Sequence, residues 1–181
     1  ADDGSVAVKL KPVIGYLGKA YIEPEPLSLV DKIVTDKGIQ GARIGLSENN
    51  MTGRLIGHEF SLAETVVAED ADIVEAAKKL IGAGVTLIVA DLEAADLLRV
   101  ADTPEASHAL LFNIRSSDEA LRHENCRKNV FHIPPDWAMR ADALAQYLIW
   151  KKWRNWALIS GERPADLDYA RALRRAAKRF G

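Results

Sequence analysis

The stretch VTLIVAD, residues 85–91, is the clearest buried strand in the sequence. It is almost entirely apolar, it ends at an aspartate, and residues 92–100 follow it with helical spacing. A second apolar run, HALLFNIR (108–115), comes next. Apolar strands joined by helices are typical of a parallel sheet whose two faces are both covered. This stretch therefore indicates an α/β fold.

The same alternation extends in both directions along the chain. KPVIGYLG (11–18) predicts a first strand, and the alternating residues 58–67 predict a second. Right-handed crossovers between such strands give a doubly wound parallel sheet in three αβα layers. The other strands are predicted at 129–133 and 155–161, and the other helices at 28–49 or 36–49, 72–81, 117–125, 136–152 and 166–180.

Composition and charge exclude several classes of protein. The 181 residues are 48% hydrophobic and 28% charged, with a net charge of −2, so no nucleic-acid partner is expected. No apolar run approaches the roughly 20 residues of a membrane span, so no direct membrane insertion is expected. The chain begins Ala-Asp-Asp-Gly without Met, as a mature exported chain does after its signal peptide is removed.

The sequence lacks the common catalytic and cofactor motifs. No G-x-G-x-x-G follows the first strand, and neither G-x-x-x-x-G-K-[ST] nor G-x-S-x-G occurs. Asp91 ends the third strand as a phospho-accepting aspartate would, but GYLGKAY (15–21) carries no acid to hold the required cation. His123 and Cys126 have no second pair at metal spacing. We therefore expect no enzyme, no cofactor and no metal.

Polar residues gather where the predicted strands end, which is where doubly wound sheets bind ligands. The corresponding loops are 17–21, 90–93, 113–117 and 133–136. The acidic cluster of Asp91, Glu93 and Asp96 fits either a helix N-terminus or a ligand contact. Ser116 or Ser117 is expected to cap the next helix, where the two hydroxyls could also hold an anion or carboxylate.

The stretch GARIGLSENNMTGRLIGHEFSL (41–62) resembles the first helix and turn of type I periplasmic solute-binding proteins of the branched-chain amino acid kind. In that family the helix carries Gly-Ala and ends in Glu-x-Asn, and a glycine-containing turn leads into the second strand. Gly41, Glu48 and Gly57 occupy such places here. We expect the amides to cap the helix end and the glycines to allow the tight return into a strand.

The resemblance continues through residues 130–181, which look like the crossing into a second lobe. ERPADLDYARAL (162–173) matches the family pattern loosely. KAYIEPEPLSL (19–29) replaces the Thr-Gly-rich ligand loop usual in the family, and in this respect the chain is similar to the subgroup that accompanies pyrroloquinoline quinone (PQQ)-dependent alcohol dehydrogenase systems.

The resemblance implies a non-enzymatic periplasmic binding component of an ABC-type importer, which partners the transporter's membrane subunits. Residues 1–133 would form the first ligand-binding lobe, and 134–181 would form the hinge and the truncated start of the second. A small polar ligand would lie between the lobes, with Arg115 pairing an anionic group and Asp91 or Glu93 taking a cation or donors. The implied ligand-binding residues are Tyr21, Asp91, Glu93, Asn113, Arg115, Ser116 and Ser117.

Two other functions remain open at this point. One is a ligand-sensing or protein-interaction domain of the same fold, in which the cleft regulates a partner. The other is a flavodoxin-like enzyme, which the absence of a phosphate-binding loop disfavours.

Overall fold

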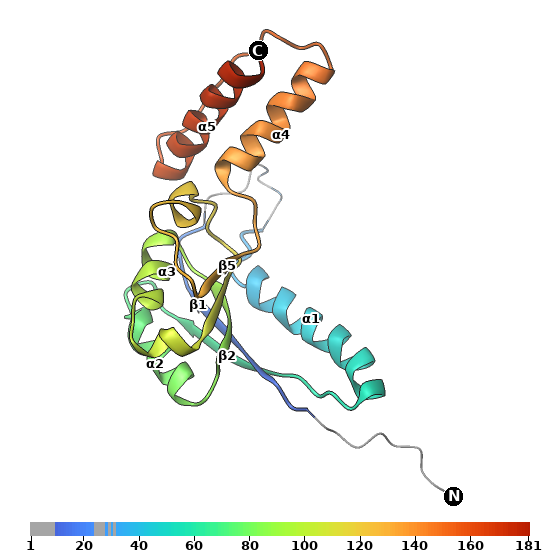
Figure 1. Cartoon of the computed structure of the whole chain (residues 1–181), viewed down its shortest axis with the longest axis vertical. Helices are drawn as coiled ribbons and strands as arrows, with labels where there is room; N and C mark the ends of the chain where they lie inside the picture. Colours follow the sequence, from blue (N-terminus) through green and yellow to red (C-terminus); the bar gives the residue numbers. More distant parts are fainter. Residues whose placement is uncertain (1–9, 24–27, 29, 31) are drawn as a thin grey trace, which may run out of the picture. The chain divides into compact units, whose positions relative to one another are not determined.

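The computed structural model describes residues 10–23, 28, 30 and 32–181 (Figure 1). The chain divides into two compact units. The first contains the described residues up to 115 together with 129–131, and the second contains 116–128 and 132–181. That residues 133 and 134 separate two ligand-binding lobes stays a prediction.

The predicted parallel sheet is present, with the strand order β2-β1-β3-β4-β5. The pairs β1–β2, β1–β3 and β3–β4 are parallel. The strands are shorter than predicted at their amino ends, because the flanking residues lie outside the ladder. They are β1 (Val13–Lys19), β2 (Ser61–Val67), β3 (Leu87–Asp91), β4 (Leu110–Asn113) and β5 (Val130–His132).

Helices cover both faces of the sheet, which confirms the doubly wound prediction. In Figure 1, α1 (Lys37–Gly53) lies on one side of the strands, and α2 (Ile73–Gly82) and α3 (Ala94–Ala101) lie on the other. The crossover through α1 leads from β1 to β2, and those through α2 and α3 lead in the opposite direction across the sheet, to β3 and β4. The right-handed rule therefore places α1 and the α2–α3 pair on opposite faces. None of the helices described is both long enough and apolar enough to cross a membrane.

The core of the first unit lies between the sheet and the α2–α3 layer. Leu17, Ile88 and Leu111 point from three neighbouring strands and are fully buried, as are Leu97 and Val100 of α3. The short 3-10 helix η2 (Glu105–His108) leads from this layer into β4. The apolar strand residues are thus buried on the α2–α3 side of the sheet. On the α1 side, Tyr16 and Asp91 form a polar contact close to the start of α1.

The end of α1 differs from the prediction that amides cap it near Asn49. The helix continues to Gly53 and passes into the 3-10 helix η1 (Arg54–Ile56). The Asn50 carboxamide instead donates to the Phe60 carbonyl at 2.8 Å and accepts from the Phe60 N–H at 2.7 Å. Gly57 ends the turn with φ of 76°, which glycine adopts without strain.

Asn50→Ala is expected to lower the free energy of unfolding by about 1 kcal/mol, because two hydrogen bonds are lost and alanine's helix propensity recovers part of the loss. Asn49→Ala is the matched control, since the exposed Asn49 bonds only the Gly45 carbonyl of its own helix. Urea unfolding of both variants measures the difference. Equal stabilities would show that the Asn50–Phe60 pairing does not hold the helix end.

The second unit is built from α4 (Trp137–Trp150) and α5 (Pro164–Phe180), which pack against each other. Small residues on α4 and α5 allow this contact. Two predictions are wrong here. Residues 117–125 form only the 3-10 helix η3 (Glu119–Arg122), and residues 155–161 form no strand. The buried residues between the helices are Ala141, Ala145, Ala172, Leu173 and Ala176.

Candidate functional site

A cavity of about 340 Å³ opens inside the first unit, where the carboxyl ends of β1 and β3 meet the start of α1. The strand order reverses at this place, because β1 pairs with β2 on one side and with β3 on the other. Doubly wound sheets bind ligands at such switch points. The cavity is lined by Tyr16, Tyr21, Glu23, Asp36, Arg43, Asp91 and Arg115, among others.

Two of the lining residues are joined by a hydrogen bond between the neighbouring strands β1 and β3. The Tyr16 hydroxyl donates to Asp91 Oδ2 at 2.6 Å. The parallel register places Gly18 beside Asp91, so the Tyr16 ring reaches the carboxylate across the smaller residue. Burial raises the pKa of the Tyr16 hydroxyl, and the bond to Asp91 raises it further. The hydroxyl therefore stays protonated and remains a donor.

The Arg115 guanidinium is surrounded by carboxylates. Its Nη2 lies 2.5 Å from Glu23 Oε1, its Nε lies 3.0 Å from Asp91 Oδ1, and its Nη1 lies 3.8 Å from Glu93 Oε1. The contact with Asp91 is an ion pair without hydrogen-bond alignment. The guanidinium also lies over the Tyr21 ring, 4.8 Å from its centroid. Arg115 thus holds the acids of three segments together.

Asp96 accepts hydrogen bonds from two residues at and just after the end of β1. The Tyr21 hydroxyl donates to Asp96 Oδ2 at 2.7 Å, and Lys19 Nζ donates to the same oxygen at 3.2 Å. Burial alone would raise the pKa of Asp96, but the bonds from Tyr21 and Lys19 outweigh it and hold the pKa below its usual range. Burial and the bond to Asp96 raise the pKa of the Tyr21 hydroxyl.

Four of the predicted site residues gather around this network, namely Tyr21, Asp91, Glu93 and Arg115. Asn113 is fully buried, and its Oδ1 accepts the Arg115 N–H at 3.1 Å, so it fixes the turn that presents Arg115.

The other two predicted residues, Ser116 and Ser117, are buried in the second unit. The prediction that one of them caps a helix is wrong, because Asp118 caps η3 by accepting from the Ala120 N–H at 3.0 Å. Ligand contact by the two hydroxyls stays a prediction.

The sequence reading missed Tyr16, Lys19, Glu23 and Gly38. A signal existed for Tyr16, since the two-residue period of β1 places it on the face opposite Leu17, in the middle of the strand. None existed for Gly38, at the start of α1. A Cβ there would overlap the Tyr16 hydroxyl and Asp91, so only glycine lets the helix approach this pair.

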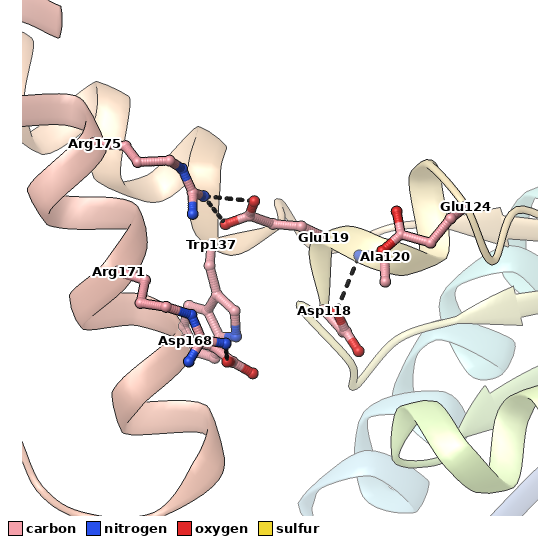
Figure 2. A pocket seen from close by; sticks show the side chains of 8 residues that line it. All are labelled: Asp118, Glu119, Ala120, Glu124, Trp137, Asp168, Arg171 and Arg175. Atoms are coloured by element: carbon pink, nitrogen blue, oxygen red, sulfur yellow. Dashed lines mark hydrogen bonds and ion pairs between the residues drawn. The ribbon is translucent and has the colours of Figure 1, made fainter.

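A second hollow, of about 330 Å³, lies in the second unit and is drawn in Figure 2. Both of its arginines are already paired. Arg175 bonds both oxygens of Glu119 at 2.5 and 2.6 Å, and Arg171 bonds Asp168. Trp137 lies between them and contacts the Tyr169 ring with centroids 5.1 Å apart. The Arg175–Glu119 pair links α5 to η3, and the Arg171–Asp168 pair lies within α5, so we interpret this hollow as structural.

Residues 31–181 match the family model described as "Periplasmic binding protein". No curated protein sequence matches the chain. Within the described part of the chain, no three His, Cys, Asp or Glu side chains are arranged to hold a metal ion.

Several solved structures share the fold at low sequence identity. An ABC transporter substrate-binding protein from Desulfitobacterium hafniense in complex with Leu is 18% identical with a TM-score of 0.70, and the match covers 94% of this chain and 48% of that one. A leucine-, isoleucine-, valine-, threonine- and alanine-binding protein from Brucella ovis, in a closed conformation, is 18% identical with a TM-score of 0.65, covering 94% and 45%. The chain thus spans about half the length of these proteins.

Proposed function

Because the chain belongs to the periplasmic binding protein family, we propose that it is the solute-binding component of an ABC-type importer and binds a small polar molecule without catalysis. The observation that carries the proposal is the cavity at the switch point of the sheet, with its ring of polar side chains. A few convergent polar groups at such a place are typical of a ligand site.

In this proposal the first unit supplies one half of the binding site. Tyr21, Asp91, Glu93 and Arg115 orient the ligand, Asn113 holds Arg115 in place, and Ser116 and Ser117 add hydroxyls beyond the turn. Residues 1–133 form the first lobe and 134–181 begin the second, with a hinge at 133–136 whose closure buries the solute. The protein works in the periplasm and delivers its solute to the membrane subunits of the transporter.

The proposal extends to the subgroup that accompanies PQQ-dependent alcohol dehydrogenase systems. Its support is KAYIEPEPLSL (19–29), which stands where the family usually has a Thr-Gly-rich loop. Part of this segment lies outside the described residues, but Lys19, Tyr21 and Glu23 are described and all join the charge network. These three described residues are thus part of the candidate site.

Thermal unfolding with a panel of solutes tests the proposed function. A bound solute at ten times its Kd is expected to raise the Tm by about 4 °C, since binding to the folded state alone adds about 1.4 kcal/mol of stability. The panel should contain amino acids, amines, organic acids, alcohols and sugars. The shift should disappear in Asp91→Asn and persist in Glu59→Gln, whose exposed ion pair with Lys11 is a separate surface contact. A panel without any shift would contradict solute binding.

The alternative is a partner-binding domain of the same fold. Its support is the exposure of large aromatic side chains in the second unit, with Trp150 71% and Trp153 59% exposed. The intact mass of the native protein from periplasmic extracts separates the two functions. A mass near twice that of this chain would support the two-lobed solute-binding protein, and a mass equal to that of this chain would favour partner binding.

A further inference from the structure

The carboxyl edge of the first unit carries an excess of negative charge. Lys19 and Arg115 are the cations that face the predicted ligand position, and Arg99 reaches the same group from outside, with Nη1 3.2 Å from Asp96 and Nη2 2.9 Å from Asp72. Arg43 is neutralised by its own two-point pair with Glu64. The carboxylates of Glu23, Asp36 and Asp91 line the cavity. Those of Glu93 and Asp96 lie beside it, where they contact the lining residues Arg115 and Lys19.

Most of the donors at this edge already contact acids. Arg115 places Nη2 on Glu23 and Nε beside Asp91, with Nη1 3.8 Å from Glu93, and Lys19 is bound to Asp96. The hydroxyls of Tyr16 and Tyr21 donate to Asp91 and Asp96. A ligand carboxylate would have to break one of these bonds and would then stand among like charges.

Acceptor oxygens, in contrast, remain available. Among the described residues, the side chain of Asp36 accepts only from the Gln40 amide, at 2.8 Å through Oδ2. Glu93 is 57% exposed at its side chain and reaches Arg115 only at 3.8 Å. Both carboxylates can therefore accept from a donor placed in or beside the cavity without loss of an existing strong contact.

We infer that the solute is an organic cation, an ammonium or guanidinium compound without a free carboxylate, and that Arg115 organises the acids instead of binding an anionic group. This inference rests on the proposed function and specifies the ligand class of the same site. It differs from the role that the sequence suggested for Arg115, because the structure satisfies that guanidinium within the chain.

Isothermal titration of this chain at low salt with four probes tests the inference. The probes are agmatine, putrescine, L-leucine and succinate. Agmatine or putrescine should bind at least about tenfold more tightly than L-leucine, and succinate should not bind. Tighter binding of L-leucine or succinate would overturn the inference while leaving the proposed function standing. Failure of all four probes, together with a wider solute panel without Tm shifts, would overturn both.

Variants separate site binding from general attraction to an acidic surface. Glu93→Gln removes an exposed acid of the site and should weaken amine binding about tenfold, whereas the matched Glu59→Gln should leave it unchanged. Arg115→Met gives an independent answer, since amine binding should persist in it. If L-leucine or succinate binds the natural chain and loses its affinity in Arg115→Met while unfolding remains cooperative, Arg115 binds the carboxylate of the ligand and the inference is wrong.

Discussion

Gly38→Ala is expected to destabilise the first unit by about 2 kcal/mol, although alanine is the better helix former. A Cβ at Gly38 would overlap the Tyr16 hydroxyl and Asp91 Oδ2. Tyr16 cannot move away, because its ring is 2% exposed and lies under Gly18 in the middle of the sheet. Asp91 cannot rotate without leaving Arg115. The Tyr16–Asp91 hydrogen bond must therefore break, or α1 must shift outward. Urea unfolding measures the loss.

Gly41→Ala is the control for this prediction. Gly41 lies in the same helix, one turn further along, and a Cβ there meets nothing. The variant should gain up to about 1 kcal/mol from helix propensity, so the two variants should differ by about 3 kcal/mol. Solute binding should weaken in Gly38→Ala only. Equal stabilisation by both substitutions would mean that α1 does not rest on the Tyr16–Asp91 pair.

The sheet could be predicted from sequence because its strands are specified by local pattern. Residues 85–91 and 108–115 are apolar runs too short for helices. Apolar strands joined by helical crossovers indicate a parallel sheet covered on both faces. The starts of two helices could also be predicted, at residues 72 and 136. Asp72 and Asp136 cap α2 and α4 with their side chains, and aspartate is a preferred residue at the N-cap.

The wrong predictions concern segments whose structure depends on distant partners. Residues 155–161 have the pattern of a strand, but a strand needs a neighbour, and within the described residues none pairs with it. Ile159 is accordingly 93% exposed. Residues 117–125 form only one 3-10 turn, which Asp118 caps and which ends at His123, where the backbone is no longer helical.

The loops of the candidate site were predictable, but their contacts were not. Strand ends marked Tyr21, Asp91 and Arg115 as neighbours, because carboxyl ends of parallel strands share one edge. Which acid meets which donor depends on the register between β1 and β3, and that register is set by packing along the whole strands. Arg115 was therefore assigned to an anionic ligand, whereas the chain itself provides its carboxylates.

Asp96→Asn is the second substitution with a large expected effect. At pH 7 it should lower the free energy of unfolding by about 2 kcal/mol, because bonds to a charged acceptor from Tyr21 and Lys19 are lost together. Lys19 and Asp96 are each only 13% exposed at their side chains, so water replaces the lost partner poorly. Arg99 adds a third, more exposed contact. Urea unfolding of the variant and the natural chain gives the difference.

The pH dependence of this difference identifies its cause. The pKa of Asp96 is held below its usual range in the folded chain, so its ionised form stabilises the fold above the pKa of an unfolded aspartate. That stabilisation is lost as the pH falls through the folded value, because the carboxylate then takes up a proton in both states. The gap between the natural chain and Asp96→Asn should therefore be full at pH 7 and close in acid. If the difference in free energy of unfolding stayed constant with pH, the effect would come from packing and not from the charge of Asp96. Glu59→Gln changes an exposed acid of the same unit and is the control, since its free energy of unfolding should equal that of the natural chain at both pH values.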